Sequence, residues 1–236
     1  MSLEHTLTTN ASISFGMASS KGYGSPFDNL ASAYDAWFEE KGKSVFTIEV
    51  QAFKEVLSLL PKPWLEIGVG SGRFAQALGI ECGLDSSTKL LDMARNRGID
   101  TLLSTGENAP FKDSAFGTVF IIVTLCFVDS PSKVLAEASR LLRSGGRLVL
   151  GLVLRESPWG QYYQLKKGEG HRFYKYASFY SYTDVKRLLE QTGFSIENVL
   201  STLFQRPSEV QQTESPRQGY SPEAGFIVIL AGKSAD

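Results

Sequence analysis

Three glycines at alternate positions, Gly68, Gly70 and Gly72, follow the apolar segment 64–67, which carries one embedded acid, Glu66. Because glycine has no Cβ, a turn built from it reaches positive φ and lets the backbone approach a ligand closely. The residues that follow are expected to open a short helix whose free N–H groups face this turn. A buried strand, a glycine turn and a helix in this order are typical of α/β sheets that bind nucleotide-like ligands at their carboxyl edge.

The spacing of the glycines narrows the class of ligand. A dinucleotide fingerprint requires G-x-G-x-x-G, but Arg73 occupies the position of its third glycine. The predicted second strand, 80–85, ends in the acid Asp85, where a carboxylate can accept both hydroxyls of a ribose. Together these elements predict a nucleoside-type cofactor site. The simpler alternatives are a plain glycine loop, Glu66 satisfied by the turn alone, and Asp85 capping the helix after Ser86.

With these residues the chain resembles class I S-adenosylmethionine-dependent methyltransferases, in particular the small-molecule type 11 group that includes the quinone-biosynthesis enzymes. The resemblance covers about residues 27–200 and depends on four motifs, which are specific mainly in combination. The motifs are L-E-I-G-V-G-S-G at 65–72, G-L-D-S-S at 83–87, S-T-G-E-N-A-P-F at 104–111 and L-R-S-G-G-R-L at 142–148. Two positions depart from the family pattern, since Thr105 and Gly117 each stand where an Asp is common.

The resemblance implies S-adenosyl-L-methionine as the cofactor and S-adenosyl-L-homocysteine as its product. Tyr34 matches a position on the N-terminal helix that folds over the cofactor, with packing in the core as the alternative. Ser86 and Asn108 are expected to flank the adenine, whose amino-group contact is left to the backbone, Thr105 or Glu107. The predicted cofactor-binding residues are Tyr34, Glu66, Gly68, Gly70, Asp85, Ser86, Thr105, Gly106, Glu107 and Leu125.

Methyl transfer from a sulfonium is an in-line displacement that needs positioning and exclusion of water rather than a covalent nucleophile. In that role the backbone at Gly68 and Gly70 is expected to touch the methionine part of the cofactor. Glu66 is expected to order the turn or the cofactor amino group, and Asp85 to accept the ribose hydroxyls. Most of the predicted site residues are therefore assigned to binding rather than to proton transfer.

The acceptor side of the site is expected in the segment 155–182, which is rich in aromatics and follows the predicted fifth strand. We predict that it is the lid that covers the acceptor and excludes water, the alternative being that its rings only complete the core. His171 is its weak candidate for a general base, or else an incidental histidine. No metal site is expected, because His5 and His171 are far apart and no spaced acid pair accompanies them.

The segment 125–129, after the predicted fourth strand, lacks the (Asn/Asp)-Pro-Pro-aromatic run of DNA amino-methyltransferases. Cys126 within it is expected to be a buried small hydrophobe rather than a nucleophile. These features argue against a DNA substrate and leave a small-molecule acceptor of unassigned atom type. Two other classes stay open: a non-catalytic S-adenosylmethionine-binding or regulatory domain, and a nicotinamide oxidoreductase, which Arg73 disfavours.

The composition of the chain limits the kinds of binding partner that are expected. The chain has 236 residues, 42% of them apolar, and a formal net charge of −1, so it carries no electrostatic footprint for nucleic acid. Its longest apolar stretch, 119–128, is too short to cross a bilayer, and no secretory signal opens the sequence. Two cysteines, Cys82 and Cys126, cannot form a disulfide framework, which predicts a cytoplasmic location. The sequence assigns no oligomeric state.

Strand and helix patterns alternate from residue 64 onward, which predicts βαβ units. We expect a three-layer α/β/α sandwich with a seven-stranded, mostly parallel Rossmann-like sheet and, as the family has, an antiparallel last strand. Residues 25–236 are predicted to form one methyltransferase domain, 1–24 a flexible tail, and 205–223 either a binding loop or a disordered stretch. The predicted strands are 64–67, 80–85, 99–103, 119–125, 147–154, 195–204 and 226–231, and helical patterns cover 27–60, 73–78 and 183–189 and begin at Ser87 and Ser130.

Overall fold

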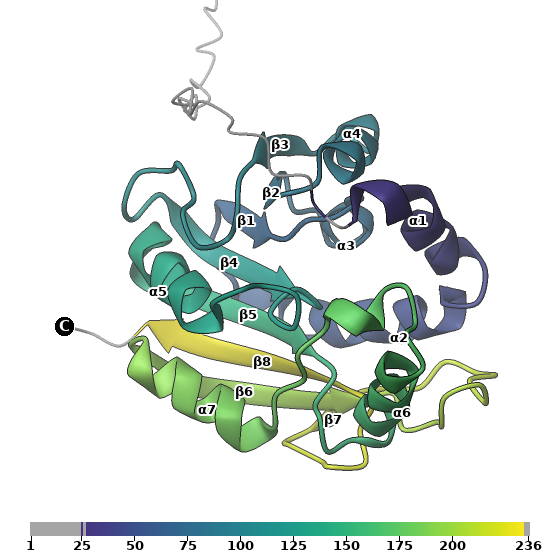
Figure 1. Cartoon of the computed structure of the whole chain (residues 1–236). Coiled ribbons are helices and arrows are strands. Elements are labelled where there is room, and N and C mark those ends of the chain that lie inside the picture. Colours follow the sequence, from purple (N-terminus) through teal and green to yellow (C-terminus); the bar gives the residue numbers. More distant parts are fainter. Residues whose placement is uncertain (1–24, 26, 234–236) are drawn as a thin grey trace, which may run out of the picture.

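The computed structural model describes residue 25 and residues 27–233, and these form one mixed sheet flanked by helices on both faces (Figure 1). The predicted tail, 1–24, lies outside the described residues. The strands are β1 Trp64–Ile67, β2 Cys82–Asp85, β3 Asp100–Leu103, β4 Phe116–Ile122, β5 Leu142–Leu152, β6 Phe194–Thr202, β7 Arg217–Gln218 and β8 Phe226–Lys233. The helices are α1 Ala31–Glu39, α2 Lys43–Lys54, α3 Arg73–Leu78, α4 Thr88–Asn96, α5 Pro131–Leu141, α6 Pro158–Gly168 and α7 Tyr182–Gln191, with short 3₁₀ turns at Asp28–Leu30, Leu57–Leu59 and Tyr174–Tyr176 (η1 to η3).

The strand order is β3-β2-β1-β4-β5-β8-β6-β7. Strands β1 to β5 are mutually parallel, while β8 runs antiparallel to both β5 and β6, which confirms the predicted antiparallel last strand. The described sheet has eight strands rather than the seven expected, because the two-residue β7 pairs with β6 and becomes the edge strand. Both β7 residues are exposed, so this strand leaves no apolar alternation in the sequence.

Several element boundaries differ from the sequence prediction. The helical run 27–60 is divided between α1 and α2, because the chain turns at Gly42, where any Cβ would collide with the Trp37 ring. Strand β4 ends at Ile122 rather than at residue 125, since Val123 adopts a positive φ of 50° and leaves the extended conformation. Ser87 caps α4 as expected, accepting the Leu90 N–H at 3.3 Å.

The start of α5 shows a further difference. Ser130 stands at its N-cap and Pro131 in its first turn, as the sequence indicates, but the Ser130 side chain makes no capping hydrogen bond. Its hydroxyl instead lies 3.3 Å from that of Ser132. Strand β5 begins directly after this helix, at Leu142, five residues earlier than the residue 147 predicted. The preceding helix therefore ends before the pair of glycines at 145–146.

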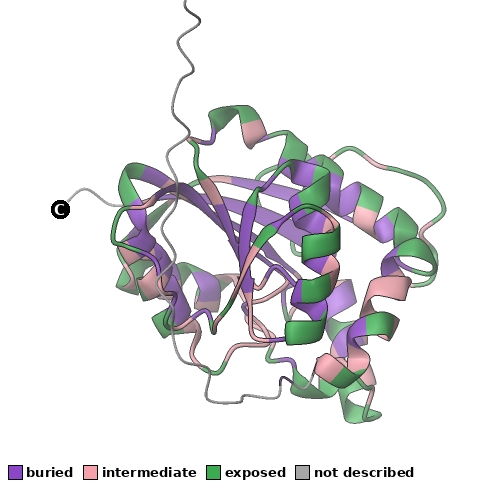
Figure 2. Cartoon of the chain, turned by 90° about the horizontal axis from the view of Figure 1, so that it is seen from above, coloured by how far each residue is buried: buried purple, intermediate pink, exposed green. Residues whose placement is uncertain are grey.

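The sheet separates two apolar cores. Helices α5 and α7 pack on one face through residues such as Val134 and Val185, and α2 and α3 pack on the other through Phe53 and Phe74. Strand β4 is buried along its whole length because its side chains enter the two cores alternately. Figure 2 shows this arrangement as a buried sheet between helices whose outer sides are exposed. The central strands therefore hold their carboxyl ends in fixed positions.

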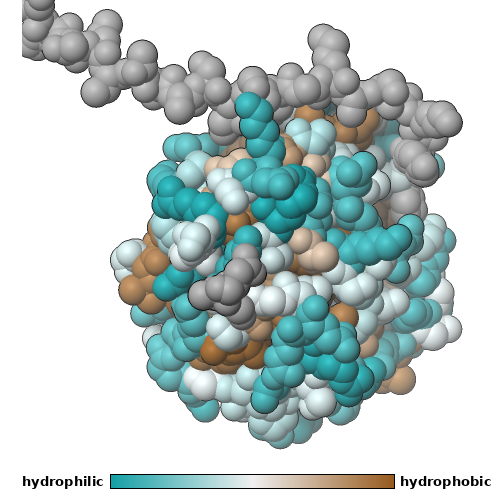
Figure 3. Space-filling view, turned by 90° about the vertical axis from the view of Figure 1, so that its left-hand side faces the viewer, coloured by the Kyte–Doolittle hydropathy of each residue, from teal (hydrophilic) through white to brown (hydrophobic). Residues whose placement is uncertain are grey.

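Charged and polar residues dominate the side of the molecule seen in Figure 3, around small and separate hydrophobic areas. Among the described residues, no helix combines the length and the apolar character that crossing a bilayer requires. The apolar content of the chain is thus used mainly inside the two cores.

Candidate functional site

The glycine turn after β1 is tied to the end of β2. The N–H groups of Gly68 and Val69 both donate to the Leu84 carbonyl, at 2.8 and 2.9 Å. Gly68 and Gly70 have φ of 76° and 54°, in the left-handed region that glycine enters most readily. At Gly68 any Cβ would also collide with the Thr124 side chain, whose hydroxyl donates to the Gly68 carbonyl at 3.2 Å. The turn therefore requires glycine for its own geometry, before any ligand is considered.

Asp85 joins this turn to the start of α4. Its Oδ2 accepts the Gly70 N–H at 2.9 Å, and its Oδ1 accepts the Ser87 N–H at 2.8 Å. Burial raises the pKa of Asp85, and these backbone donors offset part of that effect. Each carboxylate oxygen keeps a lone pair for a further donor. Ser87, not Asp85, is the N-cap of α4, so the capping alternative for Asp85 does not account for its placement.

Glu66 lies beneath the turn and is only 2% exposed. Its Oε2 has no hydrogen-bond partner among the described residues. Burial first, and the nearby charge of Asp85 second, raise the pKa of Glu66 well above its ordinary value. A buried polar atom without a partner is costly, so an ammonium or N–H donor placed here would be strongly favoured. This orphaned oxygen fits a cofactor that carries an amino group.

Tyr34, on α1, covers the glycine turn. Its hydroxyl lies 3.6 Å from the position that a Cβ on Gly70 would take. The helix is anchored by the next residue, Asp35, which accepts two hydrogen bonds from Arg73, both 2.8 Å, and one from Arg97 at 2.9 Å. Burial alone would raise the pKa of Asp35, but these guanidinium groups lower it below its usual range. Arg73, which occupies the missing third-glycine position, thus holds Tyr34 over the site.

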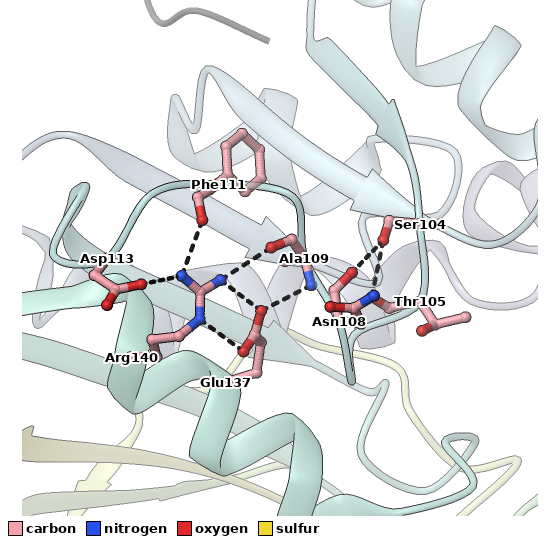
Figure 4. A network of polar contacts seen from close by, with 8 residues as sticks. All are labelled: Ser104, Thr105, Asn108, Ala109, Phe111, Asp113, Glu137 and Arg140. Carbon is pink, nitrogen blue, oxygen red and sulfur yellow. Dashed lines mark hydrogen bonds and ion pairs between the residues drawn. The ribbon is translucent and has the colours of Figure 1, made fainter. Parts of the chain in front are cut away.

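The predicted adenine segment is held against α5 by a network around Arg140 (Figure 4). The Arg140 guanidinium donates to the carbonyls of Phe111 and Ala109 at 2.9 and 3.0 Å, and pairs with Asp113 and Glu137. Glu137 in turn accepts the Ala109 N–H at 2.8 Å. Arg140 belongs to no motif that could be recognised in the sequence, and its role becomes apparent only from these contacts.

The adenine-segment residues are not equally placed for binding. Thr105 and Asn108 are exposed, whereas Gly106 is buried, and a Cβ there would lie 2.8 Å from Ile67. Glu107 accepts the Ser130 N–H at 3.3 Å, so its carboxylate is already engaged with the start of α5. Of the side chains predicted to contact adenine, Glu107 alone accepts a hydrogen bond among the described residues, while those of Thr105, Asn108 and the half-buried Ser86 make none.

A cavity of about 800 Å³ lies on the other side of Tyr34, at the carboxyl ends of β4 and β5. The turn after β4 contributes Val123, Cys126 and Phe127, and α2 contributes Val45 and Glu49. The predicted lid segment contributes the largest single share of the remaining wall. Its aromatic members in the wall are Trp159, Tyr162, Tyr163, Phe173, Tyr174, Phe179 and Tyr180. Tyr34 belongs both to this wall and to the cover of the glycine turn.

Three other predicted residues take different positions. Leu125 is fully buried in the core, so its side chain packs against strands and helices rather than facing the cavity. Cys126 lines the cavity, and burial raises the pKa of its thiol to about 12, which agrees with a non-nucleophilic role. His171 also lines the cavity, stacked on Tyr174 with 4.7 Å between ring centroids.

A hydrogen bond to the ring of His171 argues against its predicted role as a general base. Its Nδ1 accepts the Phe173 N–H at 3.4 Å, so the neutral tautomer that satisfies this contact carries its proton on Nε2. That tautomer has no free lone pair for a substrate proton. Burial first, and the charge of neighbouring Arg172 second, lower the pKa of His171. Among the described residues, no group of three or more His, Cys, Asp or Glu side chains could hold a metal ion.

Glu49 is the cavity residue that the sequence analysis missed. It lies on the buried stripe of α2, four residues after Val45 and four before Phe53, and is 5% exposed. None of the hydrogen bonds or ion pairs of the described residues involves its carboxylate. Burial raises the pKa of Glu49 to about 8. The signal was present in the sequence, since an acid at helical spacing between two core residues is unusual.

The fold and the turn are those of α/β proteins of the class that binds nucleotide-like ligands at the carboxyl edge of the sheet. A family model described as a methyltransferase domain matches residues 65–150. A similar crystal structure comes from Thermotoga maritima and is described as an S-adenosylmethionine-dependent methyltransferase, possible histamine N-methyltransferase. That protein is 39% identical in sequence to this chain, and the match covers 89% of this chain and 98% of that one, with a TM-score of 0.82.

Two uncharacterised proteins are similarly related. One, from Methanocaldococcus jannaschii, is 38% identical over 88% of this chain and 98% of its own length. The other, from Mycobacterium tuberculosis, is 39% identical over 85% of this chain and 71% of its own length. The chain belongs to the S-adenosylmethionine-dependent methyltransferase family. The predicted resemblance is thereby confirmed.

Proposed function

We propose that this protein transfers a methyl group from S-adenosylmethionine to a small molecule bound in the aromatic cavity. The observation that carries the proposal is the position of Tyr34, whose ring lies over the glycine turn and also lines the cavity. A cofactor on the turn and an acceptor in the cavity would therefore be neighbours. Holding two reactants in line at about 3 Å can supply roughly 7–11 kcal/mol of the barrier.

Different residues of the chain would serve the cofactor and the acceptor. The free lone pairs of Asp85 are available to ribose hydroxyls, and the unpartnered Oε2 of Glu66 to an amino group. The sulfonium, when bound, supplies an already activated methyl group. The rings of Trp159, Tyr163 and Tyr174 pack against one another in the cavity wall, which supports a role in covering the acceptor. This cavity is typical in size of sites for small organic ligands.

The proposal is tested by isothermal titration with S-adenosylhomocysteine, followed by a screen of metabolite extracts for uptake of labelled methyl groups. We expect micromolar binding of S-adenosylhomocysteine and labelling of a small molecule. Binding without turnover across broad acceptor pools would favour the non-catalytic alternative. Absence of S-adenosylhomocysteine binding, or preferential stabilisation by NADH in a thermal-shift assay, would contradict the proposal.

A further inference from the structure

The buried carboxyl of Glu49 is unusual in its surroundings. It faces the cavity from α2, and the walls next to it are apolar or aromatic. Burial first, and the charge of Glu49 in addition, raise the pKa values of Tyr34, Tyr163 and Tyr174. Three phenol rings from three separate elements, α1, α6 and η3, therefore lie within electrostatic range of one carboxylate.

No partner within the protein compensates this carboxylate. The cations that line the cavity are Lys41, Lys166 and Arg172, and none of them pairs with Glu49. Lys41 and Arg172 are exposed, and Lys166 pairs with Glu169 at 2.7 Å. A buried acid that is not paired costs stability when it ionises. A cationic ligand bound beside it would offset that cost.

We propose that Glu49 is the recognition residue for an amine acceptor, whose ammonium group binds this carboxylate between the aromatic walls of the cavity. Aromatic faces attract cations, and a carboxylate in a water-poor site forms a strong charge-assisted hydrogen bond with an ammonium group. A neutral or anionic acceptor of the same shape would gain neither interaction. The inference rests on the proposed methyl transfer and names the acceptor class for it.

The same residue can remove the proton that blocks the reaction. An ammonium nitrogen has no lone pair, so one N–H proton must first pass to the Glu49 carboxylate. The freed lone pair then forms the N–C bond as the C–S bond breaks, and the electron pair of that bond stays on sulfur. The products are a methylated ammonium ion, a neutral thioether and a protonated Glu49. The raised pKa of Glu49, about 8, brings it nearer to an alkylamine than an ordinary carboxylic acid is.

Three indole ligands of matched shape test the inference on the full chain saturated with S-adenosylhomocysteine: tryptamine, the alcohol tryptophol, and indole-3-acetate. We expect tryptamine to bind about 10- to 100-fold more tightly than tryptophol, the gain of one hydrogen bond to a charged group. Glu49→Gln should remove this preference and leave the tryptophol affinity within about threefold. Glu55→Gln is the matched control, because Glu55 is an exposed acid at the end of the same helix, outside the cavity lining, and it should change neither affinity.

Equal affinity of tryptamine and tryptophol, or no binding of tryptamine at millimolar concentration, would overturn the inference. A uniform loss for both ligands in Glu49→Gln would also overturn it, by indicating a structural role. Tightest binding of indole-3-acetate would assign acceptor recognition to Lys41 and Arg172 instead. S-adenosylhomocysteine is titrated first in each variant, so a failure of the proposed function is seen separately from a failure of amine recognition.

Discussion

Replacing Asp85 by Asn is the sharpest test of the cofactor site. The Asp85 carboxylate accepts the Gly70 N–H at 2.9 Å and the Ser87 N–H at 2.8 Å, and its remaining lone pairs are those predicted to accept the ribose hydroxyls. An amide keeps one oxygen but turns the other acceptor into a donor, which opposes one of the two backbone N–H groups. The side chain must then give up one backbone bond or one ribose bond, and it loses its charge.

The size of the effect follows from the bonds lost. A hydrogen bond to a charged group contributes about 1.5–3 kcal/mol, so we expect S-adenosylhomocysteine to bind roughly 10- to 150-fold more weakly to Asp85→Asn. Isothermal titration measures this loss, with Asp92→Asn, an exposed acid on α4, as the matched control. A 2′-deoxy analogue should lose affinity for the wild type but little for the variant.

An unchanged affinity in Asp85→Asn, with the control also unchanged, would refute the assignment of this carboxylate to the ribose. Equal losses for the 2′-deoxy analogue in both proteins would do the same, because they would show that Asp85 acts only on the turn. Thermal unfolding of each variant separates a loss of binding from a loss of fold. The expected shift in melting temperature is small, since the Gly68 and Val69 bonds to β2 are kept.

Three further outcomes are expected. Burial raises the pKa of Glu49 from 4.5 to about 8, so the contribution of this acid to stability is complete below pH 4.5 and is lost as the pH rises through 8. In urea unfolding, the wild type should lose about 4 kcal/mol of stability relative to Glu49→Gln between pH 5 and pH 9. Parallel stability curves for the two proteins would refute this expectation. Arg73→Ala leaves Asp35 with one guanidinium partner, which should lower the free energy of unfolding by about 3 kcal/mol. Backbone amides of α1 should then exchange hydrogen faster, and unaltered exchange would refute the anchoring role of Arg73. Because Nδ1 of His171 is engaged by the Phe173 N–H, His171→Ala should change kcat for the true acceptor less than about threefold, whereas a loss of about 100-fold would restore the general-base hypothesis.

Much of the fold could be predicted because its signals are local. The alternating glycines at Gly68 and Gly70, the acid at Asp85 and the serine at Ser87 are set by backbone conformation within a few residues, and each behaves accordingly. Apolar runs predicted the central strands, because a strand such as β4 is buried on both faces of the sheet. The edge strand β7 escaped prediction because its two exposed residues carry no such pattern.

The sequence by itself determined that a glycine turn and an acid-tipped strand meet at one edge of a parallel sheet, because strand periodicity and φ preferences act over short distances. Only the tertiary structure decided what surrounds that edge. Asp35 meets Arg73 and Arg97 across 38 and 62 residues of chain, and Glu49 acts electrostatically on Tyr163 and Tyr174, more than 100 residues away in the sequence. Such contacts depend on how whole elements pack, and desolvation of Glu49 arises only when α1, α2 and α6 close around the same cavity.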